Sequence, residues 1–140
     1  MKKQPKIGVL YSRVRVEEKW IFAVLEQLGI DYDRLDDRKF SFDMNNPEPW
    51  LKYDAVLERS ISYARGLYST RILNAWGIPT VNTAKVAEVC GNKLATVTAL
   101  SSANVPQPET RVAYTPASAL TAIEEMGYPV VLKPMVGSWG

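Results

Sequence analysis

The chain reads Trp76-Gly77-Ile78-Pro79-Thr80-Val81-Asn82 at a point where a segment with helical apolar spacing gives way to a short β-prone one. Glycine ends a helix readily because it enters the left-handed backbone region without a Cβ penalty. The same order recurs at Leu28-Gly29-Ile30 and Met126-Gly127-Tyr128-Pro129, and Ala103-Asn104-Val105-Pro106 is a variant with asparagine. Helix, stop and strand in repetition predict an α/β fold with a largely parallel sheet.

Apolar spacing sets the expected elements around these junctions. In the first expected helix the inward stripe would comprise Trp20, Ile21, Val24, Leu25 and Leu28; in the second it would comprise Leu67, Tyr68, Ile72, Leu73 and Trp76. Cys90 falls on the apolar stripe of a short helix that Thr83 can cap, so a core position is expected for it. Strands are expected at 6–11, 30–35, 53–58, 79–82, 111–114 and 129–133, and longer helices at 17–28, 63–76, 93–103 and 116–126.

The order of elements changes near residue 90. Up to Asn82 the pattern fits one parallel sheet, whereas helix–strand–helix–strand order after Gly91 indicates a smaller second module. We therefore predict one domain over residues 1–88 and part of another over 89–140, cut within a glycine-containing loop.

Composition excludes several classes of protein. Of 140 residues, 46% are hydrophobic and 23% charged, which is typical of a globular chain. The net charge is +2 without a run of five like charges, so no nucleic-acid partner is expected. One cysteine and no histidine exclude an intrachain disulfide, a Cys/His zinc site and a His-based triad. Because no long apolar run or signal-type segment is present, a cytoplasmic chain without a membrane partner is expected.

Two segments near the end of the chain carry the chemistry of anion binding. An apolar strand ends in Lys133, and Gly137-Ser138-Trp139-Gly140 follows, where small residues let backbone N–H groups approach an anion. Gly91-Asn92-Lys93 places a lysine in the first turn of a helix, where the helix dipole disfavours a cation unless an anion lies nearby. Taken singly, these segments are explained without a ligand, the first by an edge lysine and an ordinary turn and the second by a solvated surface lysine.

A third segment follows a strand and leads into a helix. Loops after the carboxyl ends of parallel strands bind ligands in open α/β sheets. Arg59 and Arg65 could hold a carboxylate there, and Ser62 could contribute a hydroxyl. The alternative is that Ser62 only caps the helix and that the arginines are surface charges.

Together these segments carry a resemblance to a known family. In order, the chain has Glu58-Arg59-Ser60, Arg65-Gly66-Leu67, Gly77-Ile78-Pro79-Thr80-Val81-Asn82, Cys90-Gly91-Asn92-Lys93, Pro106-Gln107-Pro108, Gly127-Tyr128-Pro129-Val130-Val131-Leu132-Lys133-Pro134 and Gly137-Ser138-Trp139-Gly140. It resembles the N-terminal half of an ATP-grasp ligase of the lysine-biosynthesis (LysX) type, within the RimK-like group. The resemblance implies a Rossmann-like pre-ATP-grasp domain followed by the start of a small α+β ATP-grasp subdomain.

The resemblance also implies a reaction. Such ligases use ATP and Mg²⁺ to join α-aminoadipate, or glutamate, to the C-terminal glutamate of a small acidic amino-group carrier protein. They phosphorylate the carrier's γ-carboxylate, and the amino group of the substrate then displaces phosphate. A homo-oligomer is expected.

Site residues follow from the same resemblance. It assigns nucleotide phosphates to Lys93, Lys133, Gly137, Ser138, Trp139 and Gly140, and substrate contacts to Arg59, Ser62 and Arg65. Asn92 stands where aspartate is common in the family. The family's adenine-binding hinge, magnesium ligands and catalytic arginine come after the glycine loop, so no catalytic residue or metal ligand is assigned and the chain alone is expected to be inactive. A non-catalytic α/β binding or scaffold domain and another RimK-like glutamate-adding ligase are the alternatives.

Overall fold

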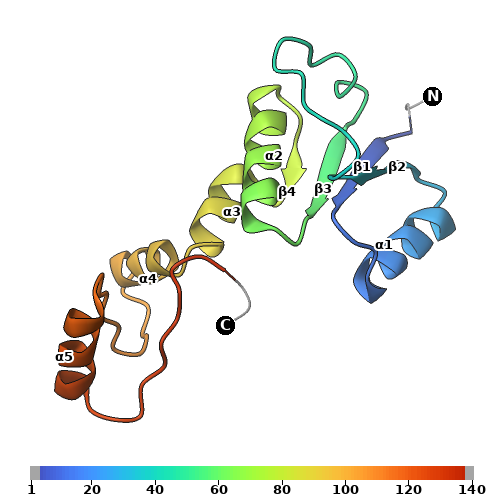
Figure 1. Ribbon diagram of the computed structural model, residues 1–140. Coiled ribbons are helices and arrows are strands. Elements are labelled where there is room, and N and C mark those ends of the chain that lie inside the picture. The colour runs from blue at the N-terminus through green and yellow to red at the C-terminus, as the bar shows by residue number, and fades with distance from the viewer. Residues whose placement is uncertain (1–3, 138–140) are drawn as a thin grey trace. The chain divides into compact units, whose positions relative to one another are not determined.

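A parallel four-stranded sheet lies at the centre of the first part of the chain (Figure 1). The structure is a computed structural model that describes residues 4–137. The strands are β1 (Lys6–Tyr11), β2 (Asp31–Asp36), β3 (Ala55–Arg59) and β4 (Thr80–Val81), in the order β2-β1-β3-β4. The predicted α/β fold with a parallel sheet is thereby confirmed.

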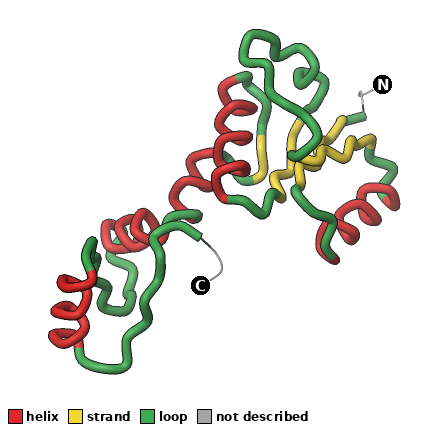
Figure 2. The backbone as a smooth tube through the Cα atoms, viewed as in Figure 1, coloured by secondary structure: helices red, strands yellow, loops and turns green. Residues whose placement is uncertain are grey.

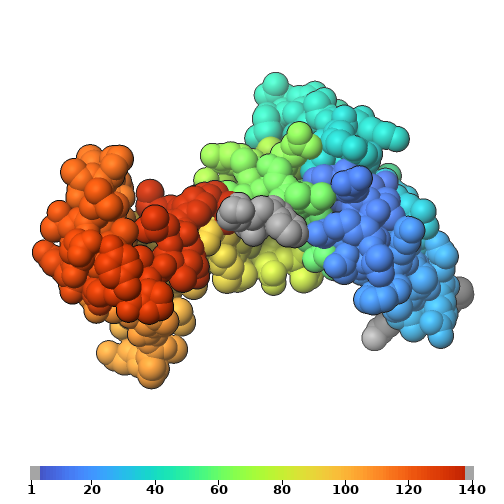
Figure 3. Space-filling view, turned by 60° about the horizontal axis from the view of Figure 1, so that its bottom comes forward, coloured from blue at the N-terminus to red at the C-terminus, as the bar shows by residue number. Residues whose placement is uncertain are grey.

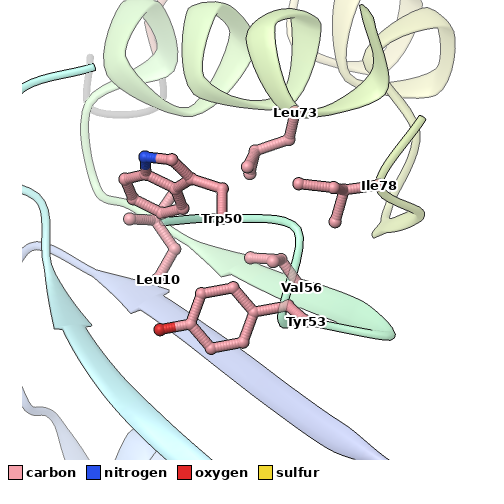
Figure 4. Packing of buried hydrophobic residues seen from close by; sticks show 6 residues of the cluster. All are labelled: Leu10, Trp50, Tyr53, Val56, Leu73 and Ile78. Carbon is pink, nitrogen blue, oxygen red and sulfur yellow. The ribbon is translucent and has the colours of Figure 1, made fainter. Parts of the chain in front are cut away.

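Two helices cover opposite faces of this sheet, because successive side chains of a strand point to opposite faces. Val9 of β1 packs with Phe22 and Leu25 of α1 (Val16–Gln27). Leu10 joins the core beneath α2 (Tyr63–Ala75), drawn in Figure 4. That core consists of Leu10, Trp50, Tyr53, Val56, Leu73 and Ile78.

Glycine is required at one position of the central strand. A Cβ built on Gly8 would lie 2.8 Å from Leu35 Cδ1 and 3.1 Å from Val56 Cγ2. Both distances are shorter than ordinary carbon–carbon contacts. The absence of a side chain at Gly8 therefore lets the neighbouring strands fill this part of the core.

The inward face of α1 differs from the prediction. Trp20, Val24 and Leu28 are exposed by 67%, 50% and 65%, whereas Phe22 and Leu25 are buried. The helix has apolar residues on both sides, so spacing alone left its rotation undetermined. Glu18 is fully buried on the sheet side, where ion pairs from the flanking loops compensate its charge.

Within α2 the prediction is partly right. Leu67 and Leu73 are buried, but Tyr68 is 58% exposed. The helix stops are confirmed by the backbone: Gly29, Gly77, Gly127 and Asn104 all have positive φ, at 64°, 77°, 78° and 53°. Each predicted left-handed residue thus ends its helix as expected.

The second part of the chain is built from short helices and long connections (Figure 2). The chain forms two compact units, Met1–Glu88 and Val89–Gly140. Helix α3 (Ala84–Cys90) crosses the boundary, and α4 (Lys93–Ser102) and α5 (Pro116–Met126) belong to the second unit. Cys90 is exposed, so the core position expected for it is wrong.

Two expected strands are absent from the second unit as far as the structure describes it. Residues 111–114 and 129–133 form no ladder, and pairing over residues 89–137 is limited to an antiparallel bridge between Asn92 and Val136. A strand needs a hydrogen-bonded neighbour, and neither segment has one among the described residues. Val131 and Leu132 are accordingly 77% and 74% exposed.

None of the described helices combines the length and the apolar character that a bilayer crossing requires.

Candidate functional site

In the second unit, the start of α4 lies against residues 135–137. Asn92 Oδ1 accepts a hydrogen bond from the Ala95 N–H at 3.1 Å and so caps the helix. The Lys93 N–H donates to the Met135 carbonyl at 2.8 Å. With the Asn92–Val136 bridge, these contacts hold the glycine-containing segment beside the first turn of the helix.

The Lys93 side chain reaches the same segment. Its ammonium donates to the Gly137 carbonyl oxygen at 2.5 Å. A cation in the first turn of a helix is disfavoured by the helix dipole, and this carbonyl offsets part of that cost. An ammonium group has three donors, and the described residues take one of them. Lys93 can therefore bind an anion with the donors that remain.

Lys133 is placed differently. It is exposed, and no hydrogen bond or ion pair joins it to another residue between 4 and 137. Ser138, Trp139 and Gly140 lie outside the described residues. The structure thus brings Lys93 and Gly137 together among the predicted nucleotide-binding residues, and it shows no contact of either with Lys133.

In the first unit, polar residues gather where β1 and β3 end. The chain leaves β1 toward β2 on one side and reaches β3 on the other, so the gap between β1 and β3 is a topological switch point. Ser12 follows β1 and Ser60 follows β3. Open α/β sheets bind ligands at such points, which makes this edge the second candidate site.

A hydrogen-bond network crosses this edge. Ser12 Oγ donates to Asp37 Oδ2 at 2.5 Å and accepts from the Ile61 N–H at 3.1 Å. The other oxygen of Asp37 accepts from Arg65 Nη1 at 3.1 Å. Asp37 therefore joins the loop after β2 to both the end of β1 and the first turn of α2.

A buried carboxylate lies beside this network. Glu18 accepts hydrogen bonds from Arg15 Nη2 at 2.9 Å and from Arg59 Nε at 3.0 Å. The side chain of Glu18 is fully buried, while those of Arg15 and Arg59 are 38% and 36% exposed. Hydrogen bonds from Arg15, and then from Arg59, lower the pKa of Glu18 from 4.5 to about 2. Arg59 is thus engaged in a structural ion pair.

Glu58, at the end of β3, is in a different electrostatic environment. Burial raises the pKa of its carboxyl group, although the Ser60 N–H donates to it at 2.5 Å. A Cβ on Gly66 would lie 2.8 Å from Glu58 Oε1, so α2 approaches the strand end closely at this glycine. The Ser60 hydroxyl is buried without a hydrogen-bond partner among residues 4–137.

A hollow of about 340 Å³ opens next to the network. Its walls include Phe40, Phe42 and Tyr68, and the Asp37–Arg65 ion pair lies among them. The Arg65 side chain is 54% exposed, so its guanidinium group can donate hydrogen bonds to a second carboxylate in addition to Asp37. The hollow offers both apolar surface and a fixed charge of each sign.

The three substrate residues predicted from the sequence thus have different environments. Arg65 lines the hollow, Arg59 is held by Glu18, and Ser62 caps α2 by accepting from the Arg65 N–H at 3.5 Å. Sequence reasoning missed Ser12 and Asp37. The available signal was that each lies within two residues of the end of a predicted strand, as Ser60 does.

Between residues 4 and 137, no three His, Cys, Asp or Glu side chains cluster so that they could hold a metal ion.

The first unit is thus an open parallel α/β sheet with a polar switch point, an architecture that binds ligands at this edge in many proteins. Comparison with known proteins makes this specific. The chain belongs to the LysX preATP-grasp domain family, which matches residues 7–89.

Relatives of known function extend beyond that range. The chain is 34% identical over 135 residues to the glutamate–LysW ligase ArgX of Sulfurisphaera tokodaii, covering 96% of this chain and 47% of that protein. It is 33% identical over 136 residues to the α-aminoadipate–LysW ligase LysX of the same organism, covering 96% and 48%. The chain therefore spans about half the length of the curated relatives that it matches.

A solved structure shows the same fold. A RimK domain ATP-grasp protein from Sphaerobacter thermophilus superposes with a TM-score of 0.80 at 28% identity. The match covers 95% of this chain and 50% of that one.

Proposed function

We propose that this chain supplies the pre-ATP-grasp domain and the first nucleotide-contacting segments of an ATP-dependent carboxylate–amine ligase. The ligase joins glutamate or α-aminoadipate to the C-terminal glutamate of an acidic amino-group carrier protein of the LysW type, in the cytoplasm. The observation that carries the proposal is the contact between Lys93 and Gly137 in a chain 34% identical to a LysW ligase along nearly its whole length.

We assign the two compact units to different roles. The first unit, Met1–Glu88, coincides closely with the family match over residues 7–89, and we assign it as the pre-ATP-grasp domain. The second unit begins the central ATP-grasp subdomain and carries Lys93, Lys133 and Gly137. Ser138, Trp139 and Gly140 follow directly in the sequence.

The chemistry we assign to the second unit is electrostatic. Phosphoryl transfer to a carboxylate builds negative charge on the phosphate oxygens, and fixed cations lower its barrier. Lys93, held at the first turn of α4, would contact one part of the polyphosphate, and Lys133 another. Magnesium would neutralise further charge, with ligands from residues that follow in the complete enzyme.

The first unit would position the acceptor. A half-exposed guanidinium at Arg65, fixed by Asp37 beside a hollow of about 340 Å³, supports binding of a carboxylate-bearing substrate or of the acidic carrier tail. Arg59 and Ser62 would shape this loop, through the Glu18 ion pair and the helix cap respectively.

The test uses the complete protein that contains this chain. It is incubated with ATP, Mg²⁺, a LysW-type carrier and either glutamate or α-aminoadipate, and the mass of the carrier is followed. An ATP-dependent gain of one amino-acid residue supports the ligase, and the faster of the two amino acids identifies the substrate. No adduct with either one, from folded protein that binds the carrier, would leave the non-catalytic binding domain as the function.

A further inference from the structure

Arg65 must be held in place if it is to present its guanidinium group to a substrate. Its side chain is 54% exposed, and between residues 4 and 137 it pairs with Asp37 alone, whose Oδ1 accepts from Nη1 at 3.1 Å. An arginine side chain has many rotamers, and an ion pair between two mobile, exposed side chains contributes little. The direction of the guanidinium group therefore depends on how firmly Asp37 is fixed.

Asp37 is fixed through both its backbone and its side chain. Its N–H donates to the Tyr11 carbonyl at 2.9 Å, which continues the pairing of β1 with β2 past Asp36. Its side chain is only 3% exposed. What remains to be set is the rotation of the carboxylate, and this depends on the partner of its second oxygen, Oδ2.

The Ser12 hydroxyl is that partner. It donates to Asp37 Oδ2 at 2.5 Å and accepts from the Ile61 N–H at 3.1 Å. A hydroxyl group has a single proton to donate. Because the Ile61 N–H occupies an acceptor position of the oxygen, the Ser12 proton is directed at Asp37. Ser12 is 8% exposed, so both bonds are shielded from water and orient the groups that they join.

Ser12 lies outside the wall of the hollow described above. Of residues 4–137, those that line the hollow belong to the segment after β2 and to α2. In Figure 3 these two segments, in cyan and green, lie side by side at the surface of the first unit. Ser12 follows β1 and is not one of the lining residues. A change at Ser12 therefore acts on a molecule in the hollow through Asp37 and the loop at Ile61.

We propose that Ser12 is a positioning residue of the hollow at Arg65: its hydroxyl fixes the Asp37 carboxylate and, through it, the guanidinium group. This inference rests on the proposed function, in which Arg65 binds a substrate carboxylate. Asp37 engages one N–H of a guanidinium group that has five. Held in this way, Arg65 keeps its other donors for the substrate, and less side-chain ordering is required when the carboxylate binds.

The opposite role of Asp37 would have the opposite consequence. If Asp37 competed with the substrate for Arg65, loosening Asp37 would free the guanidinium group and strengthen substrate binding. If Asp37 positions Arg65, loosening it weakens substrate binding. The direction of the change in KM when the Ser12 hydroxyl is removed separates these two roles.

The experiment measures KM and kcat of the complete protein that contains this chain, for the substrate whose KM responds to Arg65→Ala. We expect Ser12→Ala to raise this KM about fivefold or more, while kcat changes less than about twofold. Thr80→Val is the matched control, because it also removes a buried hydroxyl with two hydrogen bonds, from the Asn74 amide and to the Asn82 carbonyl. It should leave KM unchanged. Urea unfolding shows that the compared variants are folded.

Asp37→Asn tests the same link from its other end. It keeps the shape of the side chain but removes the charge that holds Arg65, so it should raise the same KM. It decides between positioning and competition if Ser12→Ala does not fold. A lower KM in either variant overturns the positioning role.

A double variant separates positioning from a general loss of structure. Once Arg65 is removed, Ser12 has nothing to position, so Ser12→Ala should raise KM by less than about twofold in an Arg65→Ala background. Increases in KM that simply multiply, or a Ser12→Ala variant that behaves like Thr80→Val, overturn the positioning role and leave the ligase itself intact. A ligase whose KM values do not respond to Arg65→Ala, or a protein that forms no adduct, overturns the proposed function of Arg65 together with this inference.

Discussion

The ammonium group of Lys93 donates a hydrogen bond to the carbonyl oxygen of Gly137 at 2.5 Å, joining residues 44 positions apart in the chain. The backbone N–H of the same lysine holds the Met135 carbonyl at 2.8 Å. The contact places a cation and a glycine-containing segment side by side. In the nucleotide site that we propose, a lysine held by such a contact would lose less side-chain freedom when it binds a phosphate.

Replacing Lys93 should weaken nucleotide binding without unfolding the second unit. In Lys93→Met the backbone contact to Met135 and the Asn92 cap remain, but the ammonium group is lost. We expect at least about a tenfold rise in the dissociation constant for ATP in the complete protein, measured by calorimetry. Lys85→Met removes one exposed lysine from α3 and controls for net charge. Equal affinity in Lys93→Met and Lys85→Met would contradict the assignment of Lys93.

Lys133 should show function without a contribution to stability. It is exposed and unbonded within residues 4–137, and surface substitutions away from such contacts change stability by about 0.5 kcal/mol or less. We expect Lys133→Ala to leave the urea midpoint unchanged while the ligase rate falls by at least about a hundredfold. Lys133→Arg should retain part of the rate, because the charge remains. A normal rate in Lys133→Ala would remove this lysine from the nucleotide site.

Arg65 should determine how strongly the acceptor binds. Its guanidinium group is 54% exposed beside the hollow and is held in place by Asp37. Arg65→Ala therefore removes a positioned group that could bind a substrate carboxylate. We expect KM for the carrier or the amino acid to rise about tenfold or more with little change in kcat. The control is Arg71→Ala, which removes an arginine of the same helix that pairs with Glu88 outside the hollow. An equal effect of both changes would show that only net charge matters.

Most of the first unit could be predicted from the sequence, because local signals and packing agree there. The glycine stops at 29 and 77 and the apolar β1 located the elements of this unit to within a few residues. The rotation of α1 could not be predicted, since Trp20 and Phe22 are equally plausible core residues by spacing. It depends on Glu18, a buried charge that pairs with Arg15 at the start of the same helix and with Arg59 at the end of β3.

The candidate sites were predictable to different degrees. Lys93 and Gly137 were predicted to bind an anion from residue type and from the family resemblance, and that role stays a prediction, while their mutual contact depends on the bridge between Asn92 and Val136. Ser12 and Asp37 were missed because single polar residues after strands are common, and only the sheet order places them at the switch point. The prediction of two strands after residue 110 was wrong for another reason. A strand forms only where a second strand pairs with it, and the β propensity of a segment does not show whether such a partner exists.

Gly8 should tolerate no side chain unless its neighbour is made smaller. Gly8→Ala would place a Cβ 2.8 Å from Leu35 Cδ1, and we expect a loss of about 1–3 kcal/mol in the free energy of unfolding. Leu35→Val removes the clashing atom, so the double variant should lose less than the two single losses added together. Gly29→Ala, at a φ of +64° with open space around its Cβ, is strained only by its backbone. The losses in free energy of unfolding caused by Gly29→Ala and by Leu35→Val should therefore be additive. If the losses caused by Gly8→Ala and Leu35→Val were additive too, there would be no clash between Gly8→Ala and Leu35.

Glu18 should link stability to acidic pH. Its pKa is about 2 in the folded chain and 4.5 without the arginine contacts, so the folded state favours the ionised form. The stabilisation is therefore fully present above about pH 5 and is lost as the pH falls toward 2. Glu18→Gln should cost on the order of 2–3 kcal/mol at neutral pH, less than a fully enclosed ion pair because both arginines are partly exposed to solvent. The difference in the free energy of unfolding between the two proteins should shrink steadily as the pH is lowered, in chemical unfolding followed by tryptophan fluorescence.

Glu48→Gln is the control, because it changes an exposed glutamate with no ion pair among the described residues. Its stability relative to the unchanged chain should vary little over the same pH range. If the loss in Glu18→Gln stayed constant from neutral pH down to about 2, the ionised form of Glu18 would not be what the two arginines stabilise.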